Sequence, residues 1–266
     1  MSLETFDLRL PRNAFNTRES ARAGDVWRLL QDAAILGSTR RGWPPSRYNE
    51  ENCAFIMRRM TAVHHQSAVH GACLPTRTWV ATFRRGMFSN REIRVEQSGE
   101  PLVSATQEWV HVRQPDLALV RANDALQTSF AVCDLDPPVT LPSFTPHPAG
   151  TPFSFSFDCW HMWMDPLAHA NHPLYVDWCD ESLNRRLAAA GLHPDQLTHL
   201  AEQVTWKSGV VAPERVSITS EVTGITDDGV VLTHTIAGED QRTCATAITV
   251  RGLTDGGQSA LLHALS

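Results

Sequence analysis

Hydrophobic positions in the first half of the chain switch between two periods. Over about residues 20–38 they recur every third or fourth residue, which predicts an amphipathic helix. The residues of this apolar stripe are Val26, Leu29, Leu30, Ala33 and Leu36. Shorter apolar runs that are typical of strands then cover 54–63, 77–85, 90–97 and 102–113. Ser98-Gly99 predicts a hairpin turn between the last two runs.

The second half repeats this order. Phe153, Phe155 and Phe157 alternate with polar residues as in a strand, and helical spacing follows over 176–190. Gly191 stands where a helix C-cap is expected. The strand-like runs that follow cover about 199–208, 214–224, 229–237 and 242–252, with Asp227-Asp228-Gly229 as a turn. Because a long helix precedes several antiparallel strands in both halves, the pattern indicates an internal duplication.

A proline-rich segment separates the two halves. Residues 134–152 hold six prolines, all between positions 137 and 152, and show no periodicity, as in an extended linker. We therefore expect an N-terminal domain over 1–133 and a C-terminal domain over 153–266. A long helix with one apolar stripe needs a sheet to bury it. The predicted fold class is α+β, with two long helices that are each wrapped by a curled antiparallel sheet.

Composition places the chain among ordinary globular proteins. Its 266 residues are 42% hydrophobic and 20% charged. No apolar run approaches the roughly 18 residues of a membrane span, and the N-terminus lacks a signal-peptide pattern. We expect a cytoplasmic protein with no membrane or nucleic-acid partner. The six cysteines lack metal-ligand spacing and are interpreted as small buried hydrophobes, so neither a metal nor a cofactor is predicted.

Charge is uneven along the chain. Residues 1–131 carry 17 Arg and 13 Asp+Glu, a net charge of +4, whereas residues 132–266 carry 6 Lys+Arg and 16 Asp+Glu, a net charge of −10. An arginine-rich first half can dock an acidic partner. Scattered solvated charge, combined with a preference for arginine codons, explains the same numbers. The charge pattern alone therefore leaves the partner open.

The segment from Asp165 to Trp178 brings a carboxylate, an imidazole and an amide together just before the second helix. This set suits acyl-group hydrolysis, which needs an activated water or a nucleophile and a sink for the charge on the carbonyl oxygen. Asp165 can attack directly or take a proton from water. His169 can act as the base, or can orient the water or Asp165. Asn171 can position a carbonyl or cap the helix, and the first amides of that helix, near Pro173, can bind the oxyanion.

Purely structural roles explain the same residues. Asp165 can cap a turn, and His169 can be a structural histidine whose hydrogen bonds are satisfied. We expect His172 and the His64-His65 pair on the surface or in loops.

Longer motifs recur in a fixed order over nearly the whole chain. In the first half they are Leu29-Leu30-Gln31-Asp32-Ala33, Thr78-Trp79-Val80, Gly99-Glu100, Ala105-Thr106 and Trp109-Val110. In the second half they are Asp165-Pro166, His169-x-Asn171, Pro173, Tyr175, Trp178 and Glu181. This order resembles the acyl-ACP thioesterases, which have a double hotdog fold. Asp165-Pro166 with Pro173 and Tyr175 is also similar to the catalytic segment of the 4-hydroxybenzoyl-CoA thioesterases.

The resemblance implies a thioesterase that releases a fatty or polyketide acyl group from acyl carrier protein or from CoA. Asp165 and His169 match catalytic positions of the family, and Asn171 matches a second Asn of its motif. In the family the first-half helix and sheet shape the acyl tunnel. The residues that this assigns to substrate binding are Trp27, Leu30 and Met60, together with Trp163 from an aromatic group that fits either an acyl pocket or an ordinary core. The resemblance leaves open whether two chains pair as a homodimer.

Two departures from the family pattern keep other functions open. Leu167 replaces an Asn that plant-type members carry two residues after the Asp, and the segment 206–210 lacks their downstream Glu. A non-catalytic acyl-binding protein would show such losses. A dehydratase-like lyase is a further alternative, because Asp165-x3-His169 resembles part of the dehydratase motif. The first half does not complete that motif, since Ser67 stands where its His would be.

Overall fold

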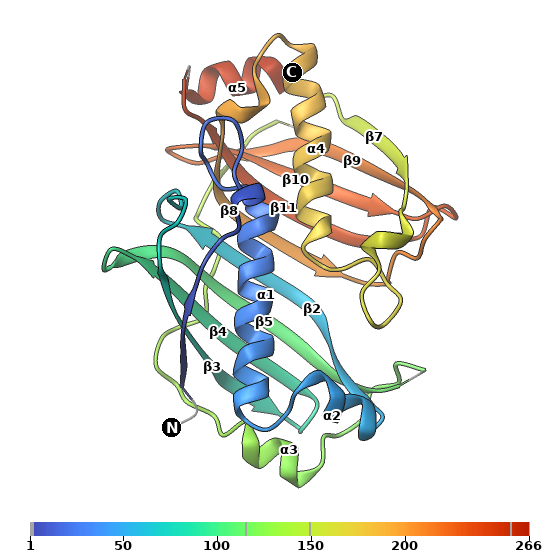
Figure 1. The fold of residues 1–266 in the computed structure, drawn as a ribbon. Helices are drawn as coiled ribbons and strands as arrows, with labels where there is room; N and C mark the ends of the chain where they lie inside the picture. The colour runs from blue at the N-terminus through green and yellow to red at the C-terminus, as the bar shows by residue number, and fades with distance from the viewer. Residues whose placement is uncertain (1–2, 115, 149, 256, 266) are drawn as a thin grey trace. The chain divides into compact units, whose positions relative to one another are not determined.

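The computed structural model describes residues 3–114, 116–148, 150–255 and 257–265. The chain divides into two compact units: the first comprises residues 1–14 and 26–140, and the second comprises residues 15–25 and 141–266. Each unit has one long helix that lies against an antiparallel sheet (Figure 1). The predicted α+β class, with its two helix-and-sheet halves, is therefore confirmed.

The first unit holds five strands in the order β1-β3-β4-β5-β2. Their bounds are Glu4–Leu8 (β1), Cys53–His64 (β2), Leu74–Arg84 (β3), Phe88–Gln97 (β4) and Glu100–Arg113 (β5). The long helix α1 spans Ala23–Arg40, and short helices cover Arg12–Ala14 (η1), Pro45–Glu50 (α2) and Asp124–Ser129 (α3). Ser98 and Gly99 have φ values of 55° and 85°, as a two-residue hairpin of the predicted kind requires.

Both faces of the first sheet are covered. Ile93 and Val95 are buried on the face that also carries Gln107, whose side-chain amide donates to the Leu30 carbonyl of α1 at 3.4 Å. On the opposite face the backbone N–H of Val139 donates to the Thr106 hydroxyl at 2.7 Å. Part of the proline-rich segment therefore lies on the outer face of this sheet, where it shields buried polar groups from water.

The second unit orders its strands β8-β11-β10-β9-β6, and β7 also pairs with β9. Their bounds are Thr145–Pro146 (β6), Phe153–Asp158 (β7), Leu197–Trp206 (β8), Arg215–Ile225 (β9), Val230–Ala237 (β10) and Thr243–Leu253 (β11). The helices are His161–Trp163 (η2), Leu174–Ala189 (α4), Pro194–Gln196 (η3) and Gly257–Leu265 (α5). Gly191, with φ of 79°, follows the C-cap of α4 and ends the helix as predicted.

A buried charge network ties α4 to the second sheet. The guanidinium of Arg251, which has no exposed surface, donates to Asp180 of α4 at 2.9 Å and to Glu202 of β8 at 2.5 Å. His199 adds a contact to Asp180 at 3.3 Å. Burial opposes ionisation of Asp180, but Arg251 and His199 together keep the pKa of that carboxyl below its ordinary value. The network therefore holds paired charges inside the unit.

A buried histidine in the same unit makes stability depend on pH. His234 contacts the Ser220 hydroxyl through Nδ1 at 2.7 Å and the Thr249 hydroxyl through Nε2 at 2.9 Å, and burial lowers its pKa to about 3. In the unfolded chain this histidine has a pKa of about 6.5, so below that pH the unfolded chain binds a proton that the folded chain does not bind. The free energy of unfolding therefore falls as the pH falls below about 6.5. Between pH 7 and pH 5 the free energy of unfolding should fall by about 2 kcal/mol less in His234→Gln than in the wild type. Urea unfolding at the two pH values measures this difference. An unchanged pH dependence would contradict a neutral buried His234.

Five of the six cysteines are buried, as predicted, and all six are free thiols. Within the described ranges, no helix is long and apolar enough to cross a membrane.

Candidate active site

The segment between β7 and α4 is fixed to the loop that follows β8. Met164 and Ala170 form an antiparallel bridge, and the Ala170 N–H donates to the Val210 carbonyl at 2.8 Å. The Asn171 N–H donates to the Trp163 carbonyl at 3.0 Å. These backbone bonds close the segment into a compact loop that presents Asp165 and His169 near the start of α4.

The carboxylate of Asp165 caps the turn that it begins. Its Oδ1 atom accepts from the N–H groups of Leu167 at 2.8 Å and His169 at 3.3 Å, and Ala168 adopts a φ of 61° at the tip. The Asp165 N–H donates to the His169 carbonyl at 2.7 Å. The Oδ2 atom makes no hydrogen bond within the described part of the chain, so one oxygen of this half-buried carboxylate is available for chemistry.

His169 rests on the backbone of the loop after β8. A Cβ atom added at Gly209 would lie only 2.0 Å from Cδ2 of the imidazole, so the ring occupies the space that any other residue at this position would fill. Among the described residues, neither ring nitrogen has a hydrogen-bond partner. The imidazole is thus positioned by packing, and its nitrogens remain able to contact a water or a carbonyl oxygen.

Adding one methyl group at Gly209 tests whether the position of the His169 imidazole matters for activity. We expect Gly209→Ala to displace the imidazole and to lower kcat by about 10²-fold if His169 takes part in the reaction. Gly150→Ala is the matched control, because the nearest atom to its added Cβ is 3.9 Å away. Steady-state kinetics of both variants make the comparison. Equal activity of the two variants would remove His169 from the mechanism.

Asn171 lies next to the helix start but does not cap it. The N-cap of α4 is Pro173, and no side chain accepts from the first turn. The first amides of the helix are also engaged: Leu174 donates to the Asn171 carbonyl at 3.0 Å, and Tyr175 donates to the His172 carbonyl at 3.3 Å. The expectations that Asn171 caps α4 and that these amides are free to hold an oxyanion are therefore wrong, because a tight first turn uses them. The Asn171 side chain remains a candidate for positioning a carbonyl.

His172 was expected on the surface or in a loop, and it lies half-buried in the turn just before α4. Its ring meets Trp206 edge-on, with centroids 5.7 Å apart, and burial lowers its pKa to about 3. Tyr175 lies 5.9 Å from the same tryptophan, and its hydroxyl accepts from the Val210 N–H at 3.2 Å. His172 therefore stays neutral and belongs to the packed wall behind the loop. No sequence signal separates it from the exposed histidines.

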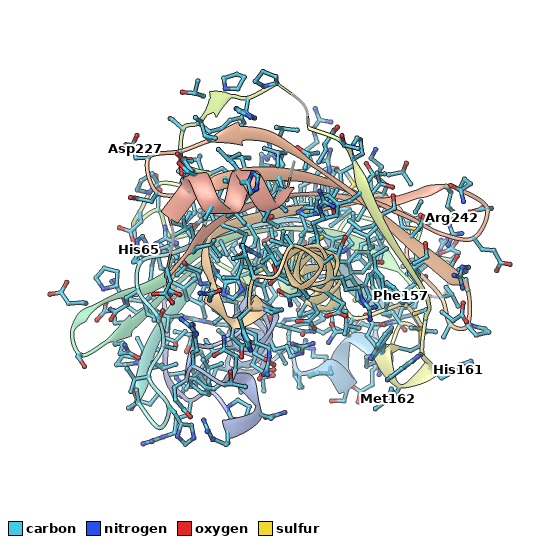
Figure 2. The ribbon with its side chains drawn as sticks, turned by 90° about the horizontal axis from the view of Figure 1, so that it is seen from above. His65, Phe157, His161, Met162, Asp227 and Arg242 are labelled. Atoms are coloured by element: carbon cyan, nitrogen blue, oxygen red, sulfur yellow. The ribbon has the colours of Figure 1, made fainter. Side chains whose placement is uncertain are left out.

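Aromatic side chains surround the loop. Trp163 stacks on Trp160 at 4.8 Å and lies 5.8 Å from Phe157 and 5.9 Å from Trp178 of α4. Figure 2 shows Phe157 between α4 and the outer edge of the loop, where His161 and Met162 project. Met162 is 81% exposed. Trp163 is thus placed beside the Asp165 turn, as its expected substrate-binding role requires, although that role stays a prediction.

Solved structures show which fold this arrangement represents. Over 94% of this chain, it is similar to a putative oleoyl thioesterase from Lactobacillus plantarum (TM-score 0.78, 16% identity, 95% of that chain covered). It is also similar to an acyl-ACP thioesterase from Bacteroides thetaiotaomicron (TM-score 0.76, 12% identity) and to the 12:0-ACP thioesterase from Umbellularia californica (TM-score 0.72, 13% identity), with 98% and 97% of those chains covered. The chain has the fold of the acyl-ACP thioesterases. Neither the comparison with protein-family models nor that with curated proteins gives a match.

Within this double hotdog fold, the segment that lacks the family's Glu contacts the candidate residues directly. Gly209 supports His169, and the Gly209 carbonyl accepts from Arg242 at 3.2 Å. A carboxylate does stand a few residues on, at Glu214, but it is bound by Arg242 at 2.8 Å and by the Val211 N–H at 2.7 Å. Despite partial burial, the Arg242 charge and these bonds keep the pKa of Glu214 below its usual range. Glu214 therefore stabilises the loop that follows β8 through these bonds, and we assign it no role in proton transfer.

The other three predicted substrate-binding residues lie in the first unit. Trp27, Leu30 and Met60 have no exposed surface, and the Met60 sulfur lies 3.6 Å from the side-chain nitrogen of Gln107. Their role toward an acyl chain stays a prediction. Across the described ranges, no group of three His, Cys, Asp or Glu side chains could hold a metal ion.

Proposed function

We propose that this protein is a thioesterase that hydrolyses an acyl thioester, fatty or polyketide, carried by acyl carrier protein or CoA. The observation that carries the proposal is the Asp165 turn. Within the described residues, Asp165 Oδ2 and both ring nitrogens of His169 make no hydrogen bond, and the two residues share one turn at the entrance of α4 in a chain with the double hotdog fold. The similar solved structures, which are described as thioesterases, support the same reaction class.

The available groups suffice for hydrolysis. Asp165 Oδ2 takes a proton from water while the water oxygen bonds to the thioester carbon, and the carbonyl oxygen becomes an oxyanion. His169 or the amide of Asn171 donates a hydrogen bond to that oxyanion. Collapse of the tetrahedral intermediate breaks the carbon–sulfur bond, and the thiolate takes up the proton, so the products are a free acid and a free thiol. In the nucleophilic alternative, Oδ2 bonds to the carbon first, and the carbon–sulfur bond breaks to release the thiolate. Water then cleaves the resulting anhydride, which gives the free acid and restores the Asp165 carboxylate, while the thiolate takes up the remaining proton.

A matched panel of acyl-ACP and acyl-CoA substrates tests the function. Free thiol is followed with a chromogenic reagent, and products are identified by mass spectrometry. A free acid with release of thiol supports hydrolysis, whereas loss of water with the thioester retained would support a lyase. The substrate carrier follows from which series has the higher kcat/KM.

A non-catalytic acyl-binding protein is the second candidate. It is favoured by Leu167 and by the lack of an acid at 206–210, and by the use of Asp165 Oδ1 as a turn cap. Tight binding of acyl ligands without release of thiol across the panel would establish it. Turnover that depends on Asp165 would exclude it.

A further inference from the structure

One end of the first unit is lined by aromatic rings that meet at Phe55 of β2. The centroid of this ring lies 6.0 Å from Tyr48, 6.1 Å from Phe83 and 6.3 Å from Phe130. Trp43 joins the group 5.4 Å from Tyr48. We call these five residues the aromatic cluster. It lies where α2 and α3 close this end of the unit (Figure 1).

Arg91 is buried against this cluster, and within the described chain no carboxylate forms a direct ion pair with it. Its side chain is 6% exposed, and its guanidinium carbon lies 5.6 Å from the centroid of Phe130. It donates to the hydroxyls of Thr78 at 3.2 Å and Ser38 at 3.4 Å. In the part of the chain that the structure describes, no carboxylate oxygen comes within the 4.0 Å of an ion pair. Its partners are therefore neutral and its contacts long.

Two local features make this arrangement costly for the fold. Burial lowers the pKa of Arg91 to about 10, although Tyr48 and the more distant Glu4 carboxylate oppose this shift, so the group stays charged at neutral pH. A buried charge without a direct ion pair destabilises a fold. The helix that faces it has a glycine there, because a Cβ at Gly37 would lie 2.8 Å from Nη1 of Arg91. Glycine inside a helix is itself unfavourable. Locally unfavourable features of this kind are expected at functional sites, where binding of a ligand can offset them.

Further buried polar atoms at the cluster lack partners among the described residues. They are Nε1 of Trp43 and Nε2 of His111. The His111 ring lies 5.1 Å from Phe55, and its Nδ1 lies 2.9 Å from the Val120 carbonyl. Since a carbonyl only accepts, Nδ1 carries the proton and Nε2 is an acceptor. Burial lowers the pKa of His111, which keeps the ring neutral. The cluster thus offers cationic and neutral donors together with one acceptor.

The rest of the same sheet face shows that folding does not demand these groups. Two and four residues beyond Arg91 on β4, Ile93 and Val95 are buried on the same face, and their partners on β5 are Ala105 and Val103. Between β4 and β5 that end packs hydrocarbon on hydrocarbon, and on β3 the partners are the uncharged Thr78 and Thr76. A plain alkyl chain would likewise need only hydrocarbon surfaces, and would leave Arg91, His111 and Trp43 unsatisfied.

We propose that the aromatic cluster with Arg91, His111 and Trp43 binds an acyl group that carries oxygen beyond its thioester. Arg91 and Trp43 donate to a carbonyl or carboxylate oxygen, and Nε2 of His111 accepts from a hydroxyl. The aromatic rings hold the carbon skeleton. This inference rests on the proposed function and narrows it, from acyl groups in general to oxygenated ones of the polyketide kind.

The short helices that close this end should open more readily than the long helix α1. Within the described chain, α2 has no buried residue and α3 has one, Leu126. Both are short, so moving them exposes less apolar surface than moving α1. Entry of a ligand therefore needs no rearrangement of the sheet.

Binding of free acids tests the proposal without any need for turnover. Isothermal titration would compare a ladder of saturated fatty acids of increasing length with their ω-oxo and ω-carboxy analogues of equal length. We expect the oxygenated acids to bind the wild type on the order of tenfold more tightly. Arg91→Met should abolish the preference, Arg91→Lys should keep part of it, and Arg77→Met, which removes an exposed arginine of the neighbouring strand, should leave it intact. A preference for plain acids, no binding of either kind, or a preference that survives Arg91→Met overturns the proposal.

Thermal unfolding separates a ligand-binding arginine from a structural one. Because Arg91 is buried without a direct ion pair in the described chain, Arg91→Met should unfold at the wild-type temperature or above it. A midpoint lowered by several degrees, with selectivity unchanged, would make Arg91 a structural residue and overturn the proposal. Failure of the thioesterase function looks different: oxygenated acids would still bind through Arg91 while no thioester is hydrolysed. Equal turnover of plain and oxygenated thioesters would leave the function standing and remove the inference.

Discussion

Replacing Asp165 by Asn should lower kcat/KM by about 10³-fold while the protein unfolds at nearly the wild-type temperature. The asparagine Oδ1 can accept from the N–H groups of Leu167 and His169 as the carboxylate does, so the turn keeps its cap. What disappears is the negative charge and basicity of the second oxygen. The substitution therefore separates the structural role of Asp165 from its chemical one. Thiol release under single-substrate conditions measures the loss.

A matched control uses the same substitution a few residues away. Asp158 at the end of β7 is exposed and pairs with Arg215 at 3.0 Å on the surface, so Asp158→Asn should retain full activity. Asp165→Ala should lose both the cap and the charge, and should unfold at a lower temperature than Asp165→Asn. Full turnover by Asp165→Asn would show that Asp165 only caps the turn.

Replacing Arg251 by Met should destabilise the protein by about 3–5 kcal/mol. The substitution leaves the carboxylates of Asp180 and Glu202 buried in the second unit without their shared counter-ion. Removing one partner of a buried ion pair costs far more than the pair contributes, because the remaining charge has lost both water and its hydrogen bonds. Urea unfolding at neutral pH measures the change in the free energy of unfolding.

Arg215→Met, at the start of β9 in the same unit, is the control. Arg215 and Asp158 are 61% and 69% exposed, so the loss of their pair should cost at most about 1 kcal/mol. Arg251→Met should also become less harmful at low pH, where the two carboxyls can protonate. A stability change as small as that of Arg215→Met would mean that water reaches the network.

The sequence predicts those elements that follow from local periodicity. The long helices and their following strands were found because apolar residues recur with the period of each element, as in α1 and in β9 to β11. The Ser98-Gly99 hairpin was found because only residues that tolerate positive φ suit such a turn. Asp165 and His169 are indicated by the polar residue types that gather before the second helix and by the family resemblance. Both side chains are half-buried, and one carboxylate oxygen and the two ring nitrogens make no hydrogen bond within the described residues.

Features that depend on contacts between distant residues were not predictable in this way. His172 resembles any loop histidine in the sequence, and its half-buried position depends in part on a contact with Trp206 of β8. The residues of the charge network in α4, β8 and β11 are up to 71 positions apart in the sequence, from Asp180 to Arg251. The amides of Leu174 and Tyr175 are consumed by a tight first turn, which composition does not reveal. In each case a contact between distant residues, or a local backbone hydrogen bond, decides the environment of the residue, and the residue type alone does not predict it.

The two oxygens of Asp165 have separate duties, and this has a stereochemical consequence. In the proposed mechanism Oδ1 is held by two amides, so Oδ2 would be the oxygen that meets the acyl carbon, and the carboxylate would approach from one side. If an anhydride forms at Oδ2, Oδ1 becomes its carbonyl oxygen and still accepts from the same amides. The turn would then keep one conformation through acylation and deacylation, and the backbone would have no reorganisation to undergo between the two half-reactions.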